Sequence, residues 1–156
     1  MSINIVLYQP EIPPNTGNIA RSCAITGAKL HLIKPLGFSI DDKHLKRAGL
    51  DYWSYLELEV HESEKAFFEK YGDQRLYFAT TKATKYYDEC AFEPDCFIIF
   101  GKETSGLPPH IHEKYPENRF KIPMIKNEHL RSLNLSNSVA IILYEALRQN
   151  DFFDLK

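Results

Sequence analysis

The chain has 156 residues, of which 44% are apolar and 26% are charged, and its formal net charge at pH 7 is −2. This length and balance fit one folded domain over residues 1–156, and they exclude both a disordered chain and a general polycation. The apolar run Ile5–Tyr8 is too short for a leader or a membrane span, so we expect a cytoplasmic protein.

Short β-branched and aromatic runs alternate with helical patterns along the chain. Strands are expected at Ile3–Tyr8, Lys29–Lys34, Leu56–His61, Arg75–Thr81, Cys96–Phe100 and Phe120–Met124. This alternation predicts the α/β class, with a mostly parallel sheet flanked by helices.

Helices are predicted at Thr16–Thr26, Lys65–Tyr71 and Leu135–Gln149. Asn15 is the expected N-cap of the first helix, and Gly27 is expected to end it in a left-handed conformation. Ser63 is placed to open the second helix. The third helix has an apolar stripe that should face the core.

Cations gather in the segment 42–49, where Lys43, Lys46 and Arg47 follow one another at helical spacings. A solvated helix face and a phosphate-binding patch would both have this pattern, and the spacing alone favours the solvated face.

Ligand sites in parallel sheets lie beyond the carboxyl ends of the strands, so the loops found there are the most informative. The loop Gln9–Gly17 is rich in proline and leads into a helix that presents Asn15 and Arg21. Helix N-termini and arginine both favour anions. A stiff turn with capping asparagines would explain the same loop, apart from Arg21.

A second loop, Phe100–Leu107, has glycines at 101 and 106 that let the backbone approach a ligand. It is not a Walker A loop, because Gly106 is followed by Leu107 and Pro108 instead of Lys and Ser or Thr. The first strand also lacks the Gly-x-Gly-x-x-Gly turn of dinucleotide enzymes. Nucleoside triphosphatases and dehydrogenases are therefore disfavoured.

A third loop runs from Ile122 to Ser138, and five of the seven residues from Ser132 to Ser138 are serine or asparagine. One helix cap needs fewer polar side chains than this, so we interpret the segment as the wall of a pocket.

Other catalytic chemistry has little support in the sequence. No Gly-x-Ser-x-Gly elbow is present for a nucleophilic serine. His110 and His112 should point apart as surface side chains, and the three cysteines, which form no Cys-x-x-Cys pair, are expected to be buried apolar residues. We expect no metal ion.

Three motifs carry a resemblance: Pro14–Arg21, Phe100–Gly106, and Ile122–Met124 with Ser132–Asn137. In order and spacing they resemble the three motifs of SPOUT RNA ribose 2′-O-methyltransferases. The likeness covers essentially the whole chain and is strongest to the small bacterial enzymes that modify the wobble nucleotide of leucine tRNAs.

The resemblance implies a fold, a cofactor and partners. The fold would include a deep C-terminal trefoil knot, which periodicity alone does not predict. The cofactor would be S-adenosyl-L-methionine. The partners would be the anticodon stem-loop of a tRNA, with its cytidine or modified uridine as target, and a second copy of the chain in a homodimer.

The resemblance also implies roles for individual residues. Arg21 would stabilise the alkoxide that develops at the ribose oxygen, and Asn15 would position nearby groups. Cofactor contacts would come from Ala79, Thr80, Gly101, Glu103, Ile122, Ser132, Leu133 and Asn134. Phosphates of the RNA would be bound by Lys43, Lys46, Arg47 and Arg131.

Alternatives remain at this point. A methyltransferase of the same fold could act on another tRNA or rRNA nucleotide, and a nonenzymatic RNA-binding factor could keep the fold without the reaction. A flavodoxin-like enzyme is a third alternative, although the phosphate-binding loop after the first strand is missing.

Overall fold

The computed structural model describes residues 1–41, 43, 45, 47 and 52–156. Six strands form one sheet in the order β3-β2-β1-β5-β4-β6. They are β1 (Asn4–Tyr8), β2 (Lys29–Ile33), β3 (Glu57–His61), β4 (Leu76–Ala79), β5 (Phe97–Phe100) and β6 (Arg119–Phe120). Every neighbouring pair is parallel, which confirms the predicted class.

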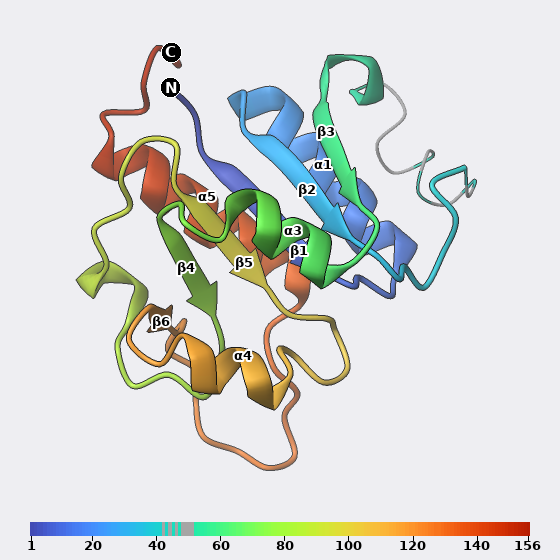
Figure 1. The fold of residues 1–156 in the computed structure, drawn as a ribbon. Helices are drawn as coiled ribbons and strands as arrows, with labels where there is room; N and C mark the ends of the chain where they lie inside the picture. The colour runs from blue at the N-terminus through green and yellow to red at the C-terminus, as the bar shows by residue number, and fades with distance from the viewer. Residues whose placement is uncertain (42, 44, 46, 48–51) are drawn as a thin grey trace.

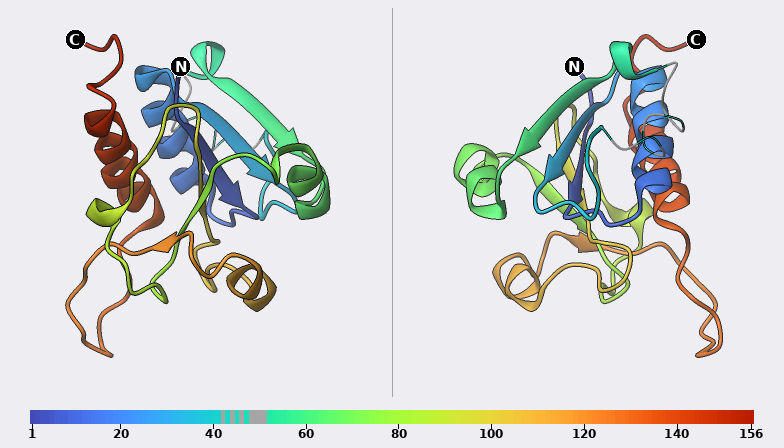
Figure 2. Two further views of the ribbon diagram at one scale, coloured as in Figure 1. Left: turned by 60° about the vertical axis from the view of Figure 1, so that its left-hand side comes forward. Right: turned by 90° about the vertical axis from the view of Figure 1, so that its right-hand side faces the viewer.

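Helices cover both faces of the sheet, as Figures 1 and 2 show. One face is covered by α1 (Pro13–Thr26) and α5 (Leu135–Gln149), and the other by α3 (Glu64–Tyr71) and α4 (Pro109–Lys114). Two 3-10 turns, η1 (Trp53–Tyr55) and η2 (Tyr87–Glu89), lie in the connections. No helix in the described part of the chain has the length and apolar character needed to cross a bilayer.

The strands separate two apolar clusters because successive side chains point to opposite faces. Ile5 and Leu7 of β1 belong to the cluster beneath α1 and α5, whereas Val6 and Tyr8 belong to the cluster with Phe67 of α3. Burial on both faces explains why the central strands are almost continuously apolar. Full burial of each such side chain stabilises the fold by roughly 2 kcal/mol.

The three cysteines are buried, as predicted, and each is a free thiol. Burial raises the pKa of the Cys23 and Cys96 thiols to about 12. Both stay protonated at neutral pH and act as small apolar side chains.

Helix α1 begins earlier than the sequence predicted. Its N-cap residue is Ile12, with prolines at the first two helical positions, so the assignment of Asn15 as N-cap is wrong. Prolines are tolerated there because the first helical N–H groups have no partner within the helix. At the other end Gly27 has a φ of 72°, the predicted left-handed conformation.

The other helix boundaries agree closely with the prediction, but the last strand, predicted at Phe120–Met124, ends four residues early. Ser63 caps α3 by accepting a hydrogen bond from the N–H of Ala66, as expected. Helix α5 has the predicted bounds. Strand β6 is only two residues long, because the chain beyond Phe120 leaves the sheet and continues as the loop toward α5.

The strand order reverses between β1 and β5, which are neighbours in the sheet but far apart in sequence. All carboxyl ends lie at one edge, at the bottom of Figure 1, and both chain termini lie at the opposite edge. The loops that leave β1 and β5 therefore flank the position where open parallel sheets bind their ligands.

Candidate functional site

A cavity of about 920 Å³ lies at this carboxyl edge. It is lined by the start of α1, by the loops after β4 and β5, and by the segment that leads into α5. All eight predicted cofactor residues line it: Ala79, Thr80, Gly101, Glu103, Ile122, Ser132, Leu133 and Asn134. The three motif loops thus meet at one place.

The other predicted site residues are more dispersed. Asn15 and Arg131 line the cavity. Arg21 is exposed on α1, is not among the cavity residues, and its guanidinium carbon lies 4.8 Å from the ring centroid of Tyr52. Lys43 and Arg47 are exposed. Lys46 lies outside the described residues.

Glu103 joins the loop after β5 to the start of α1. Its carboxylate accepts hydrogen bonds from the N–H groups of Glu11 and Ile12 at 2.9 and 2.8 Å, and from the amide of Asn15 at 3.3 Å. A negative charge at a helix N-terminus is favourable. The acceptor for these amides is thus about ninety residues away in sequence, which explains why local patterns misplace the start of α1.

A reciprocal contact strengthens the same junction. The Glu11 carboxylate accepts hydrogen bonds from the N–H and the hydroxyl of Thr104, at 3.1 and 2.7 Å. These bonds lower the pKa of Glu11. The loops after β1 and β5 therefore hold each other by two carboxylates, one from each loop.

Gly101 and Gly106 close the loop after β5 into a tight turn. The N–H of Gly106 donates to the carbonyl of Lys102 at 2.9 Å. A Cβ atom at Gly101 would lie 2.4 Å from the carbonyl carbon of Gly106, so no larger residue fits there without a shift of the backbone. Gly106 has a φ of 68°, a conformation that favours glycine.

The third loop is joined to α1 by a pair of asparagines. Asn134 is the N-cap of α5 and accepts hydrogen bonds from the N–H groups of Ser136 and Asn137. Its amide group donates to the side-chain oxygen of Asn15 at 3.1 Å. The polar residues before α5 therefore cap the helix and form a wall of the cavity, as the sequence predicted.

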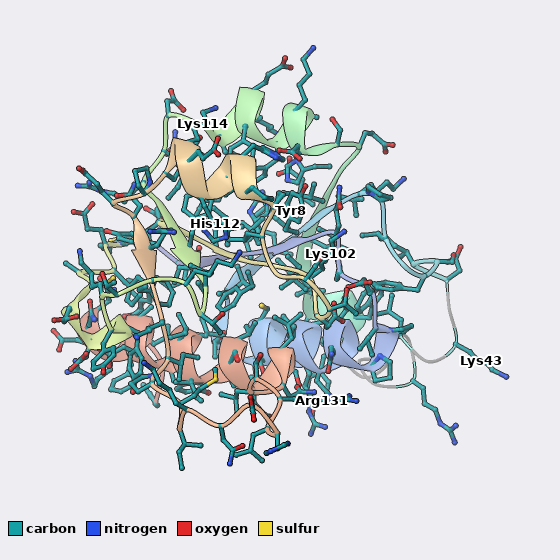
Figure 3. All side chains as sticks on the ribbon, turned by 90° about the horizontal axis from the view of Figure 1, so that it is seen from below. Tyr8, Lys43, Lys102, His112, Lys114 and Arg131 are labelled. Atoms are coloured by element: carbon teal, nitrogen blue, oxygen red, sulfur yellow. The ribbon has the colours of Figure 1, made fainter. Side chains whose placement is uncertain are left out.

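Most of the charged side chains that line the cavity are positive. Among its described residues the charged side chains are Lys82, Lys102, Glu103 and Arg131, and the one carboxylate already binds the amides ahead of α1. Lys102, His112 and Arg131 are labelled in Figure 3, which looks onto this edge, and Lys43 lies at its periphery. Anionic groups of a ligand, such as a carboxylate or a phosphate, are therefore favoured here.

His112 was predicted to be a surface side chain, but it is half-buried and lines the cavity. Its Nδ1 atom accepts a hydrogen bond from the guanidinium of Arg119 at 3.2 Å. Burial, together with the charges of Arg119 and Lys82, lowers the pKa of His112. Lys82 and His112 belong to no motif, so only their places relative to the strand ends could have indicated them, whereas Lys102 lies within the second motif.

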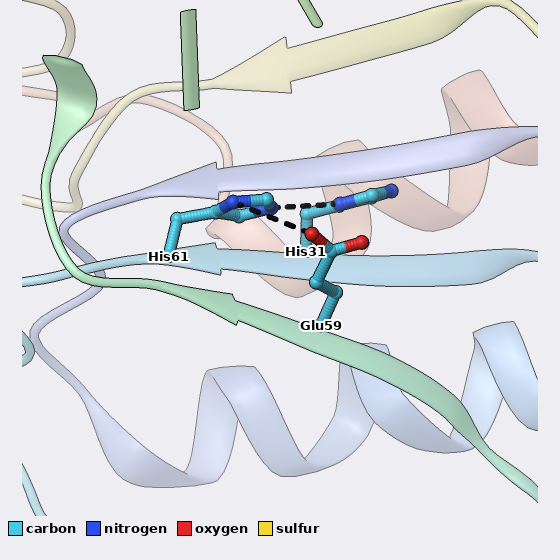
Figure 4. Close-up of side chains that lie close together, drawn as sticks. All are labelled: His31, Glu59 and His61. Atoms are coloured by element: carbon cyan, nitrogen blue, oxygen red, sulfur yellow. Dashed lines mark hydrogen bonds and ion pairs between the residues drawn. The ribbon is translucent and has the colours of Figure 1, made fainter. Parts of the chain in front are cut away.

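A second polar cluster lies within the sheet, away from the cavity (Figure 4). His31 is fully buried, His61 is nearly so, and Glu59 lies beside them. The amide of Asn4 donates to backbone carbonyls, so its oxygen faces His31 Nε2 at 3.0 Å and accepts that proton. His31 Nδ1 then accepts a hydrogen bond from His61 Nε2, also at 3.0 Å.

This cluster has the residue types of a metal site, but its environment opposes a dication. The two facing nitrogens of His31 and His61 already bind one another. Glu59 contacts both Lys29, at 2.9 Å, and Lys70, at 2.6 Å, so cations outnumber carboxylates there. We interpret the cluster as a hydrogen-bonded link between strands.

The cavity suits an amphiphilic ligand. Ala79, Phe100 and Leu133 supply apolar contacts, and Thr80 and Ser132 supply hydroxyl groups. Such a lining can enclose a flat ring on one side and bind a sugar or a charged tail on the other.

Comparisons with known proteins identify relatives. Residues 2–144 match the model of the SpoU rRNA methylase family. A protein of Methylovorus glucosotrophus, named tRNA (cytidine(34)-2′-O)-methyltransferase, is 54% identical over 150 residues, which are 96% of each chain.

Solved structures agree with this relation. A structure described as an RNA methyltransferase from Bacillus anthracis has a TM-score of 0.90 at 47% identity, covering 99% of this chain and 98% of that one. Another, described as giving insight into 2′-hydroxyl methylation of C/U34 on tRNA, has a TM-score of 0.90 at 41% identity, covering 96% and 97%.

More distant likenesses show the fold alone. The SpoU methyltransferase AviRb of Streptomyces viridochromogenes, described in complex with AdoMet, has a TM-score of 0.83 at 22% identity, covering 96% of this chain and 58% of that one. Since the family model spans most of the chain and close relatives span all but a few residues, the chain belongs to the SpoU methylase family.

Proposed function

We propose that the protein transfers a methyl group from S-adenosyl-L-methionine to the ribose 2′-hydroxyl of the wobble nucleotide, a cytidine or modified uridine, in tRNA. Leucine tRNAs are the expected substrates. The observation that carries the proposal is the meeting of all three motif loops at one cavity. The names of the full-length relatives support the choice of nucleotide.

The cavity residues fit this cofactor. Backbone groups of the loops around Gly101 and Ile122, with the apolar side chain of Leu133, would hold the adenine, and Thr80, Ser132 and Asn134 would bind polar groups. When bound, the cofactor supplies an electrophilic methyl group on a sulfonium. The chain's own contribution is to orient the reactants and to exclude water from them.

The reacting oxygen needs a positive partner, because a ribose hydroxyl is a very weak acid. Arg21 is our candidate for this role, since a guanidinium stays protonated and can stabilise a developing alkoxide. In the single chain Arg21 is not among the residues that line the cavity. We therefore infer a homodimer in which Arg21 of one copy faces the cavity of the other.

We further infer that the C-terminal part of the chain forms the trefoil knot of the family. The arrangement that supports this is the passage from β6, through a long loop, to α5 on the far side of the sheet. RNA phosphates would be bound by Arg131 at the cavity and by the cations predicted for this role in the segment 42–49, which are Lys43, Lys46 and Arg47.

The proposed function is tested by incubating the purified protein with methyl-labelled cofactor and individual tRNAs, and then mapping the labelled nucleotide. We expect label on the 2′-oxygen of the wobble nucleotide of leucine tRNAs. Label at another tRNA position, or in rRNA alone, would show that the protein methylates that other nucleotide instead. Absence of transfer to any RNA, with cofactor binding retained, would favour an RNA-binding factor.

A further inference from the structure

The loop 121–134 between β6 and α5 projects beyond the carboxyl edge of the sheet, as Figure 2 shows. It is fixed at both ends: the N–H of Lys121 donates to the carbonyl of Lys85, and Asn134 binds Asn15. A turn orders its middle, where the N–H of Leu130 donates to the carbonyl of Asn127 at 3.0 Å. These hydrogen bonds give the projecting loop a defined conformation at the mouth of the cavity.

Four apolar side chains of this loop are exposed. The exposed fractions of Met124, Ile125, Leu130 and Leu133 are 40%, 78%, 57% and 37%. Met124, Leu130 and Leu133 line the cavity, so a cofactor there would cover them in part. Ile125 is not among the lining residues, and a bound cofactor would not explain its exposure. Because Ile125 is one of four exposed apolar side chains on a single projecting loop, we interpret this part of the loop as a contact surface for a further partner.

The charges around Ile125 indicate the chemistry of that partner. Lys126 follows it directly, and Arg131 closes the loop at the cavity, where Lys82 and Lys102 add positive charge. The loop's one carboxylate, Glu128, lies 3.7 Å from His129. A second copy of this loop would bring like charges together. RNA instead offers apolar base faces between phosphates, which fits an isoleucine among cations.

We propose that Ile125 is a positioning residue that inserts beside the target nucleotide and separates it from the neighbouring stacked base. This inference rests on the proposed function. Bases of an anticodon loop stack on one another, and a sugar oxygen must leave that stack to reach a methyl group inside a cavity. Apolar side chains that insert between stacked bases perform this step in other nucleic-acid complexes.

The test uses the full-length protein and an anticodon stem-loop with 2-aminopurine on the 3′ side of the wobble nucleotide. This base analogue fluoresces more strongly when it is unstacked. We expect the wild-type protein to raise the fluorescence, I125S to abolish most of the rise, and I125L to restore it. In turnover with tRNA, kcat/KM should fall about tenfold in I125S, because the apolar contact is lost.

The matched control is L155S, which removes an exposed leucine near the chain terminus at the opposite edge of the sheet and should leave both readouts unchanged. Cofactor affinity, measured by calorimetry, should be the same in all variants. An equal fluorescence rise in I125S would overturn the proposal. A change in the sedimentation of I125S would also overturn it, since Ile125 would then face a second copy. Failure of the wild-type protein to methylate any RNA would count against the proposed function itself.

Discussion

Gly101 and Gly106 lie in one turn but should tolerate a side chain very differently. A Cβ at Gly101 would lie 2.5 Å from the nitrogen of Leu107, whereas a Cβ at Gly106 would have no atom within 4 Å. G101A should therefore displace the loop and lower cofactor affinity at least tenfold, as measured by calorimetry. G106A should cost about 1 kcal/mol of stability through its positive φ, with a smaller loss of affinity.

Comparison of G101A with G106A separates two causes of lost cofactor affinity, which are steric overlap and backbone strain. If both variants lost affinity equally, backbone strain rather than the close approach at Gly101 would govern the loop. Thermal unfolding in the absence of cofactor provides the control, because a G101A chain that unfolds near the wild-type temperature has lost the site and not the fold.

The eight predicted cofactor positions all line the cavity. Their contacts with the cofactor stay a prediction. Lys82 and His112 were missed because they lie in no motif and their place depends on which strands are neighbours. Lys102 was missed although it lies within the second motif, between Gly101 and Glu103. Asn15 was assigned a local capping role, but its partners are Glu103 and Asn134, both from distant segments.

Strands β1, β2 and β3 are linked side by side through Asn4, His31 and His61. Burial, with the charges of Lys29 and His61, lowers the pKa of His31 to about 3, so this imidazole is neutral in the folded protein. In the unfolded chain it binds a proton below pH 6.5. Its contribution to stability is therefore full above pH 6.5 and is lost progressively as the pH falls toward 3.

We expect the free energy of unfolding, measured by urea denaturation, to fall by about 2 kcal/mol between pH 7 and pH 5. H31Q keeps a donor and an acceptor at this position but does not titrate, so its profile should be flatter over the same range. Carboxylates remain mostly ionised in this window, which isolates the imidazoles. Parallel profiles for the two proteins would show that His31 does not cause the pH dependence.

The elements themselves follow largely from periodicity, because strands buried on both faces must be apolar throughout. The six predicted strands and three predicted helices are present. Their ends were less accurate where long-range contacts decide them. Glu103 permits α1 to begin at Pro13, and pairing of β6 with β4 alone ends that strand after Phe120.

At the scale of the whole molecule, the position of Arg21 allows a test of the inferred dimer. R21A should keep its cofactor affinity and lose methylation, because in the proposed mechanism the arginine stabilises the ribose oxygen and does not contact the cofactor. G101A should lose both. Co-expression of the two chains should restore about a quarter of the wild-type turnover, since half of the dimers are mixed and each mixed dimer has one complete site.

A mixture without activity, in which mixed dimers are shown to form by differential tagging, would place Arg21 in the site of its own chain. Undiminished turnover in R21A alone would remove Arg21 from the reaction. Whether Arg21 acts in its own chain or in the partner's site could not be derived from the sequence by physical rules, because the pattern of one chain does not indicate which surface a second copy covers.

The positive lining of the cavity has a consequence for the end of each catalytic cycle. Methyl transfer converts a sulfonium into a neutral thioether, so the spent cofactor carries one positive charge fewer than the donor. Lys82, Lys102 and Arg131 would repel the sulfonium of a bound donor but not the thioether that remains. We therefore expect S-adenosylhomocysteine to bind more tightly than the donor and to inhibit turnover as it accumulates. Removal of this product would then limit the rate of turnover.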